Sequence, residues 1–533
     1  MKRNALTYLL LPFLLALLVT ACKDDTLPAS PAEEEEAGSG VYVSVVVNTG
    51  GSNASRADGA TDEYNPTGGE KGDGEWPGES YENTIHNLYL YFFDGGEENG
   101  VRKGINADGG IPLIGPIEFT FGDNLYGGGT RYYTEPQEIN NLQIGKTYDV
   151  LAIANIVLKV GIADFTTLGQ LRDASNAEAI SHPTGDAMRF VMSSANPTFD
   201  AGQRINSVEI TGDNSRNNPA TVTIDVERLA ARIDCHVAEN GEYTVEGTEG
   251  DKVKIQGMVA VNKYVMNDIN FETKGEYERS YWFKRVSEWV ELTESIPVNY
   301  LGDEQPVDGT GPATNYVIGP MTLTPPEIKD RLGDQQPYDH SFYFNKNNLE
   351  HWEENWITVE ELMAGITSEQ NYVTYHLLDY VEENIVSAEM LADPVNRDYY
   401  CTGVLFKATY IPAGFTEGQT FYWYANKFYR TLSDIATEMG GNIALTDDNC
   451  VQYGIYKYTK GTCYYTYWIR HADDGDDTKI SPMEYAIVRN NIYQLNVTSV
   501  NGIGSVEPTG DAQVIITVYV EDWKDIPTNA VEW

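Results

Sequence analysis

Residues 41–48 read VYVSVVVN and residues 513–521 read QVIITVYVE. In both stretches a branched aliphatic residue occupies every second position, which is typical of a β-strand with one apolar face. The residues on these faces are Val41, Val43, Val45 and Val47 in the first stretch and Val514, Ile516, Val518 and Val520 in the second. Gly-rich segments lie beside both stretches. The sequence therefore predicts a detachable strand near each end of the chain, and the two strands suit the same groove.

The sequence between these strands indicates an all-β chain with minor α content. Short strand patterns alternate with Gly and Pro turns, as they do in β-sandwiches. The clearest strands are expected at residues 147–156, 254–262, 403–411 and 491–500.

A turn-rich break at residues 214–219 sets the expected domain boundary. It divides an N-terminal β-sandwich, residues 57–219, from a C-terminal β-sandwich, residues 220–533, which ends in the strand at 513–522. A short helix is expected at 167–173. The Glu-rich stretch 358–391 fits either one or two helices or a long irregular loop.

The chain is strongly acidic, with 36 Lys and Arg against 80 Asp and Glu and a net charge of -44 over 533 residues. A surface of this sign repels phosphate, which excludes nucleic acid as a partner and anionic lipid as an electrostatic one. Removing residues 1–56 takes away four basic and six acidic residues, which leaves 32 against 74 and a net charge of -42. The excess of acid therefore belongs to the folded part of the chain.

The first 22 residues have the pattern of a lipoprotein signal. Lys2 and Arg3 precede an apolar run, and the sequence VTAC at 19–22 resembles a lipobox that ends at Cys22. Residues 1–21 are therefore expected to be a signal peptide, with the lipid on Cys22. Residues 22–56 would form a charged, Pro-containing tether followed by the first strand, which is a removable pro-strand in this interpretation.

The loop after the first strand contains one basic residue, Arg56, followed by Ala57. A trypsin-like protease reaches such small, polar segments, although an uncut surface loop is the alternative. Cleavage there would free the first strand and open an apolar trough at a sheet edge. The strand at 513–522 of another copy could fill the trough and build an open head-to-tail filament. In the alternative, that strand pairs within its own domain.

The sequence offers little for catalysis. It contains no GxSxG elbow, HExxH helix or P-loop, and its cysteines form no CxxC pair. We therefore expect no enzymatic activity, no cofactor and no metal site. Cys450 and Cys463 either bridge a hairpin or are free buried thiols. The aromatic runs 421–424 and 464–468 fit half-buried strand pairs better than a carbohydrate-stacking platform.

Several segments together resemble the Bacteroidales fimbrillins, the type V pilus subunits, and most closely the major shaft subunit of the short, Mfa-type fimbriae. The segments that carry this resemblance are residues 19–22, 41–47, 55–59, 226–233, 464–468, 488–493 and 514–523. The resemblance implies two transthyretin-like Greek-key β-sandwiches in a subunit that supports adhesion and biofilm formation. It also implies a lipidated precursor on the cell outer membrane and an Arg-specific protease that cuts between Arg56 and Ala57.

The partners implied by the resemblance are copies of the chain itself in a head-to-tail polymer, together with accessory anchor and tip subunits. Before processing, the lipid would hold the chain in the outer membrane, and after processing the chain would lie in the fimbrium. Two other interpretations stay open at this stage. One is a tip or anchor subunit of the same pilus, and the other is a surface glycan-binding lipoprotein.

Overall fold

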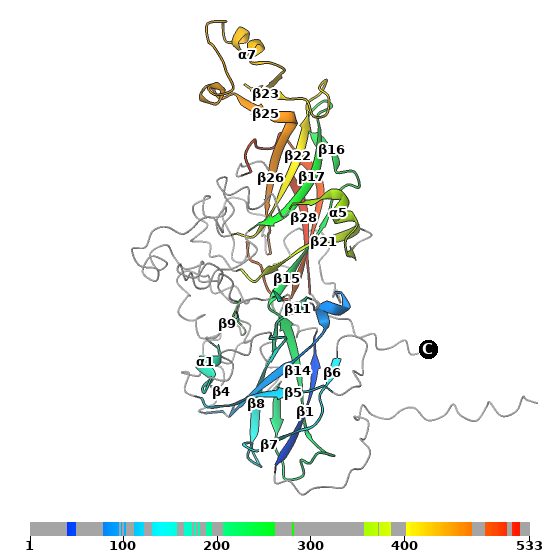
Figure 1. Ribbon diagram of the computed structural model, residues 1–533, viewed down its shortest axis with the longest axis vertical. Helices are drawn as coiled ribbons and strands as arrows, with labels where there is room; N and C mark the ends of the chain where they lie inside the picture. Colours follow the sequence, from blue (N-terminus) through cyan, green and yellow to red (C-terminus); the bar gives the residue numbers. More distant parts are fainter. Residues whose placement is uncertain are drawn as a thin grey trace, which may run out of the picture.

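The fold is built on two large β-sheets that follow one another along the long axis of the molecule (Figure 1). The computed structural model describes residues 40–49, 78–94, 97–98, 101–102, 111–121, 131–156, 165–172, 175–176, 180–181, 188–194, 206–261, 280–281, 356–370, 373–384, 401–471, 485–508 and 514–522. The all-β fold with sandwich-like packing that was predicted from the sequence is confirmed.

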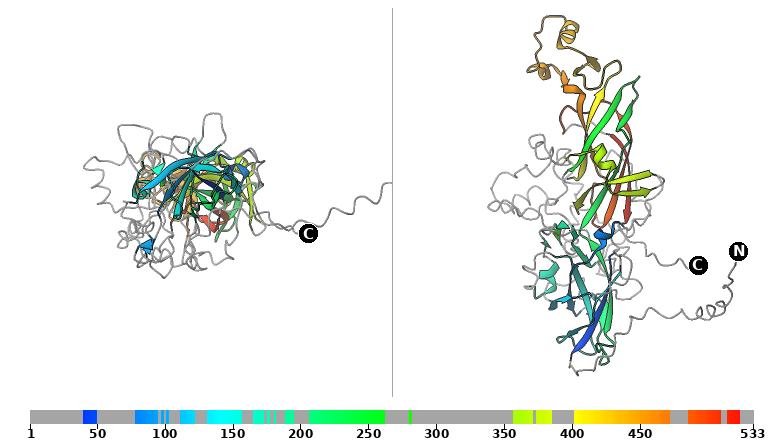
Figure 2. Two further views of the ribbon diagram at one scale, coloured as in Figure 1. Left: turned by 90° about the horizontal axis from the view of Figure 1, so that it is seen from below. Right: turned by 45° about the vertical axis from the view of Figure 1, so that its right-hand side comes forward.

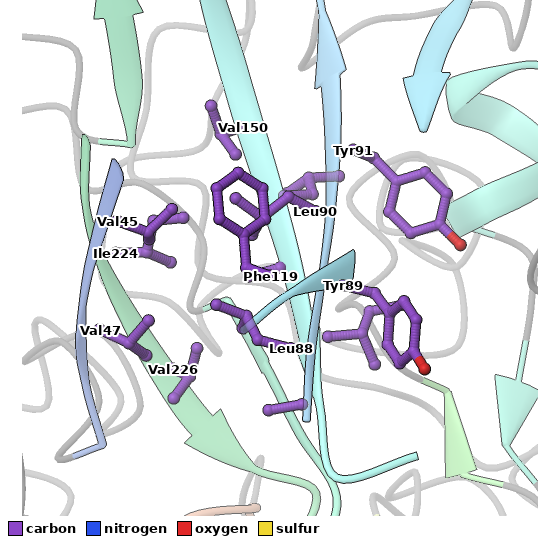
Figure 3. Close-up of a cluster of buried hydrophobic side chains, with 14 of the residues drawn as sticks. Val45, Val47, Leu88, Tyr89, Leu90, Tyr91, Phe119, Val150, Ile224 and Val226 are labelled. Atoms are coloured by element: carbon purple, nitrogen blue, oxygen red, sulfur yellow. The ribbon is translucent and has the colours of Figure 1, made fainter. Parts of the chain in front are cut away.

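The first sheet has nine strands and forms the lower body in Figure 1. Its strands are β1 (Val41–Asn48), β2 (Leu88–Phe93), β5 (Leu113–Phe119), β6 (Arg131–Tyr133), β7 (Gln137–Ile139), β8 (Thr147–Ala154), β12 (Met192–Ser194), β13 (Ser207–Glu209) and β14 (Ala220–Arg228). Most of its buried apolar side chains form one core, because both β2 and β8 are almost continuously apolar. The sheet curls so that β1 and β14 face β2 and β5 across this core (Figure 3).

Small elements accompany the lower sheet. They are η2 (Ser80–Asn83), α1 (Leu168–Arg172), β3 (Glu97–Glu98) paired with β4 (Val101–Arg102), β9 (Ser175–Asn176) paired with β18 (Ser280–Tyr281), and β10 (Ile180–Ser181) paired with β11 (Arg189–Phe190). Helix α1 confirms the helix expected at 167–173.

The second sheet has ten strands and forms the upper body. Its strands are β15 (Ala230–His236), β16 (Glu242–Glu246), β17 (Lys252–Val261), β19 (Ile357–Thr358), β20 (Thr367–Gln370), β21 (Val373–Glu382), β22 (Gly403–Ile411), β26 (Thr462–Trp468), β27 (Asn491–Asn501) and β28 (Val514–Asp522). The strands expected at 254–262, 403–411 and 491–500 are confirmed as β17, β22 and β27 within two residues at each end.

A small module extends from the far end of the upper sheet. It comprises residues 412–461, between β22 and β26, and we call it the upper module. Its elements are β23 (Phe421–Tyr424), β24 (Lys427–Tyr429), α7 (Leu432–Glu438), η7 (Cys450–Tyr453), β25 (Tyr456–Tyr458) and η8 (Thr459–Gly461). Both Figure 1 and the right-hand view of Figure 2 place it at the end of the molecule opposite to β7.

The domain boundary predicted after Pro219 falls one strand too early. Strand β14 pairs with β1 and β12 in the lower sheet, and the upper sheet begins with β15. Buried and exposed residues alternate along most of β14, as they do in any half-exposed strand, so this pattern fits either domain. Its place is decided by its pairing with β1, which local sequence does not reveal.

The stretch 358–391 is mostly neither helix nor loop in its described part. Helix α5 (Val359–Met363) is five residues long and is followed by the hairpin of β20 and β21. Strand β21 pairs with β15 and buries Tyr375, Leu378 and Val381. The helical expectation therefore holds for α5 but not for residues 367–382, where sheet pairing outweighed the helix propensity of the Leu- and Glu-rich sequence.

Candidate assembly site

Strand β1 occupies a slot inside the lower sheet. It pairs in parallel with β14, from Val43 opposite Ala220 to Asn48 opposite Asp225. On its other side it pairs antiparallel with β7 and then with β6. The sequence predicted a groove at a sheet edge, but a strand with neighbours on both sides leaves two open hydrogen-bonding edges when it departs.

The apolar face of β1 is almost fully buried. The exposed fractions of its four alternating valines are 6% for Val41, 0% for Val43, 1% for Val45 and 0% for Val47. Figure 3 shows Val45 and Val47 beside Ile224 and Val226 of β14, with Leu88 and Phe119 across the core. The first strand therefore completes the lower core, as its alternation predicts.

Polar contacts fix the register of β1. The amide of Val45 donates to Thr134 Oγ1 at 2.9 Å, and the amide of Thr134 donates back to the carbonyl of Val45 at 3.0 Å. On the face turned away from the core, Ser44 Oγ lies 3.1 Å from Thr221 Oγ1, and Asn48 Nδ2 donates to Asp225 Oδ1 at 2.7 Å. A one-residue slip would break these contacts and turn the valines out of the core.

Strand β28 lies at an edge of the upper sheet. It pairs antiparallel with β27, from Asn491 opposite Asp522 to Val500 opposite Val514, with an irregularity between Val497 and Ser499. Among the described strands β27 is its one ladder partner. Ile516 is partly buried against the upper core. In the monomer the C-terminal strand therefore pairs within its own domain, the alternative left open from the sequence.

A buried polar cluster joins the two bodies. Arg232 of β15 donates through Nη1 to both carboxylate oxygens of Glu82, at 3.2 and 3.3 Å, and through Nε to Asp234 at 2.6 Å. Tyr380 of β21 also donates to Glu82, which belongs to η2 of the lower body. Burial disfavours the charge on Arg232, but Asp234 and Glu82 raise its pKa above the ordinary value. Burial and the neighbouring carboxylate of Glu82 likewise raise the pKa of Tyr380.

The same cluster receives the ends of two strands. Arg228, the last residue of β14, donates through Nη1 to Asn490 Oδ1 at 2.8 Å. The amide of Asn490, next to β27, donates to the carbonyl of Ala230 at 2.8 Å. Arg489 donates to Glu383 at 2.9 Å. Paired buried charges fix geometry more than they add stability. This joint therefore holds two strands in one arrangement: β14, which pairs with β1, and β27, which pairs with β28.

None of these joint residues was predicted from the sequence to form a site. Residues 226–233 carried only the family resemblance. The available signal was Arg228 and Arg232 on either side of the apolar residues 229–231, since a buried arginine requires carboxylate or carbonyl partners.

The remaining sequence-predicted sites fall into two groups. Cys22, Arg56 and Ala57 lie outside the described residues. Cys450 and Cys463 are free buried thiols, as is Cys235. The aromatic runs lie in β23 and β26 and pair with neighbouring strands, as expected.

Within the described part of the chain, no three His, Cys, Asp or Glu side chains are grouped as metal ligands. None of the helices found there has the length and apolarity to cross a membrane. Burial raises the pKa of the Cys463 thiol to about 12, which keeps it protonated and unreactive.

One family model matches the chain. Residues 456–529 match the major fimbrial subunit protein type IV family, fimbrillin, C-terminal domain. This segment contains β26, β27 and β28. The match confirms the resemblance to the fimbrillins and supports a structural, non-enzymatic protein. No curated protein matches the chain.

Several solved structures are similar to the chain at low sequence identity. The tip fimbrial protein Mfa3 from Porphyromonas gingivalis is 11% identical with a TM-score of 0.33, covering 91% of this chain and 99% of that one. A candidate cell adhesion protein from Parabacteroides distasonis ATCC 8503 is 13% identical with a TM-score of 0.38, covering 91% and 100%. A fimbrial assembly protein from the same strain is 16% identical with a TM-score of 0.24, covering 46% and 73%.

Proposed function

We propose that the chain is a shaft subunit of a surface fimbria that is exported as a lipoprotein through Cys22, cleaved after Arg56 and polymerised by donor-strand exchange. The family match supports a fimbrial subunit on the cell surface. One observation carries the finer steps. Strand β1 fills a two-sided apolar slot and is joined to the rest of the fold through the segment that contains Arg56.

Cleavage converts a stable strand into a removable one. A cut after Arg56 breaks the covalent link between β1 and residues 57–533, so that only the ladders and the core hold β1 in place. Burial of its four valines contributes about 6–12 kcal/mol, and the ladder bonds add about 0.5–1.5 kcal/mol each. An empty slot therefore exposes a large apolar surface and favours capture of another strand with the same pattern.

Strand β28 has the pattern and the direction for this slot. Strand β1 begins at the lower end of the molecule, where Val41 pairs with Ile139, and runs toward the joint. Strand β28 begins at the upper end, where Val514 pairs with Val500. If β28 leaves β27 and swings about its first residue into a copy stacked above, it runs in the direction of β1. The donor strand would then be parallel to β14 and antiparallel to β6 and β7.

The proposed partners follow from this geometry. The chain polymerises with copies of itself, head to tail, because donor strand and slot lie on different bodies of one molecule. The other proposed partners are an Arg-specific protease and accessory anchor and tip subunits. Before processing, the chain also contacts the outer membrane through its lipid. A shaft role is favoured over a tip or anchor role because the sequence holds both a cleavage site and a donor strand.

The test is deletion of residues 513–533. Because the slot would still be emptied by cleavage but no donor strand would exist, we expect processed monomers and no filaments, read by electron microscopy of sheared surface material. The matched control is Arg56→Ala in the full chain, which should give subunits that begin at Cys22 and do not polymerise. Normal filaments from the truncated chain, or filament subunits that begin at Cys22 in the wild type, would refute the proposal.

A further inference from the structure

The largest exposed apolar side chains of the described residues lie at the two ends of the molecule. Val451 is 64% exposed, Tyr453 41% and Tyr456 38%, all in η7 and β25 of the upper module. Ile144, 66% exposed, lies in the turn between β7 and β8 at the opposite end. Exposed apolar groups that gather at defined places mark interaction sites more often than scattered ones do.

The upper-module patch is held in a fixed shape. Ile435, Cys450 and Ile455 form a small core in this module, and Cys450 and Ile455 are the chain neighbours of Val451 and Tyr456. Ion pairs tie its elements together, between Lys427 and Glu438 at 2.7 Å and between Lys457 and Asp447 at 2.5 Å. A preorganised surface loses little conformational entropy on binding. The patch of Val451, Tyr453 and Tyr456 is therefore suited to contact a partner.

The opposite end consists of two neighbouring turns, residues 140–146 and 210–219, which we call the lower-end turns. The amide of Gly145 donates to the carbonyl of Ile210 at 2.7 Å, and the amide of Ile210 donates to the carbonyl of Lys146 at 2.9 Å. These bonds hold Ile144 next to the second turn. The lower-end turns carry Lys146, Arg216 and Asp213, a net charge of +1.

The charge balance separates the two ends from the rest of the subunit. The upper module has five acidic and four basic residues, a net charge of -1, whereas the whole chain carries -44. The strongly acidic sides of two subunits repel each other. The upper module of one subunit and the lower-end turns of another carry weak net charges of opposite sign and do not repel each other. The favoured partner for each end is therefore the other end of a second copy.

The length of the chain before β28 restricts where that copy can lie. Thr466 of β26 donates to the carbonyl of Pro508 at 3.1 Å, and β28 begins at Val514. With Pro508 in place, the chain from 508 to 514 spans about 20 Å at most. In the proposed exchange, the first residue of β28 sits at the lower end of the acceptor. That lower end must then lie close to Thr466, which is four residues along β26 from the start of the strand at the upper module.

We infer that the upper module of one subunit packs on the lower-end turns of the next, so that the patch of Val451, Tyr453 and Tyr456 covers Ile144. This contact rests on the proposed donor-strand exchange and adds to it a second interface that sets the angle between successive subunits. Tyrosine is enriched in such interfaces because a rigid ring buries much area at low entropic cost.

The test places a photo-crosslinking benzoylphenylalanine at position 453 of the full chain, followed by illumination of assembled filaments and peptide mapping. We expect crosslinks to peptides that contain residues 140–146 or 210–219 of another copy. Adding Ile144→Asp should lower the crosslink yield about tenfold, because a carboxylate replaces the apolar contact. The matched control carries the probe at Thr244, an exposed position on β16, and should give no such product.

The crosslinking results distinguish a failure of the end-to-end contact from a failure of donor-strand exchange. Filaments whose probe at position 453 crosslinks elsewhere, or not at all, would overturn the end-to-end contact and leave donor-strand exchange standing. Absence of filaments from the wild-type processed chain would overturn donor-strand exchange and the contact with it. Crosslinks to the lower-end turns in the chain lacking residues 513–533 would show a contact that does not depend on exchange, and would contradict the linkage inferred here.

Discussion

Strands β1 and β28 have nearly the same apolar pattern but lie in different environments. Strand β1 has ladder partners on both sides and buries its valines in the lower core. Strand β28 has one ladder partner among the described strands and lies at the edge of the upper sheet. A strand between two neighbours cannot leave without opening two ladders and a core, whereas an edge strand leaves by opening one ladder.

This difference explains why the chain would need a protease. In the proposed exchange, both strands would fit the same slot, and the strand already in it holds the stronger position. The edge strand would become the better occupant only after β1 is cut from the fold and can diffuse away. The position of a strand in its sheet, more than its sequence, decides whether it is locked or available.

The largest expected effect comes from placing a charge on β1. Val45→Asp buries a carboxylate at a site that is 1% exposed, with Ile224 and Phe119 nearby. We expect a loss of about 3–5 kcal/mol in the free energy of unfolding of the uncleaved chain, measured by urea denaturation. In a chain that begins at Ala57 the substitution is absent, so filaments assembled from cleaved precursor should be normal.

Thr223→Asp, at an exposed position on the neighbouring strand β14, is the control and should change stability by less than about 0.5 kcal/mol. If Val45→Asp and Thr223→Asp destabilised the uncleaved chain equally, β1 would not be the locked strand described above.

The second-largest effect is expected from placing a charge on β28 instead of β1. Ile516→Asp changes β28, where the side chain is only partly buried in the monomer. We expect the uncleaved chain to lose about 1 kcal/mol, but filament formation to fail, because the aspartate would enter the apolar slot of the next subunit. Urea denaturation of the uncleaved chain measures the loss of stability, and sedimentation of the cleaved protein measures filament formation. Filaments in normal yield would show that β28 does not enter a buried slot.

The smallest effect concerns one hydrogen bond of the slot. Thr134→Val removes the acceptor for the amide of Val45 and leaves a buried donor unpaired. The expected cost is about 1–3 kcal/mol in the uncleaved chain. Since the same threonine would receive the donor strand, the variant should also weaken the filament joint, which a guanidinium titration of filaments measures. If Thr134→Val weakened only the uncleaved chain or only the filament joint, β1 and β28 would not share the slot.

The sequence predicted the strands better than their neighbours. Alternation identified β1 and β28 because a strand with one apolar face has a sequence period of two. The same pattern did not reveal that β14 belongs with β1, nor that β1 has two neighbours, because pairing joins residues about 180 positions apart. The helical expectation at 358–391 holds only for α5, and it missed β21 for a related reason, since β21 is defined by its pairing with β15.

The joint between the bodies was missed for a different reason. Its charged residues, such as Arg232 and Glu82, lie 150 positions apart and are stable in the interior only because they meet there. A single sequence shows each charge alone, where it resembles a surface residue.

If β28 of one subunit replaces β1 of the next, a pair of cysteines at facing positions of the donor strand and β14 will join neighbouring subunits. Ser44 lies opposite Thr221, and the residue of β28 with the same place in the pattern is Thr517. In filaments of the doubly substituted chain, Thr221→Cys with Thr517→Cys, the account predicts intermolecular disulfides that join the subunits into a ladder on non-reducing gels. Filaments that contain no such disulfide, while each single variant assembles normally, would contradict the account.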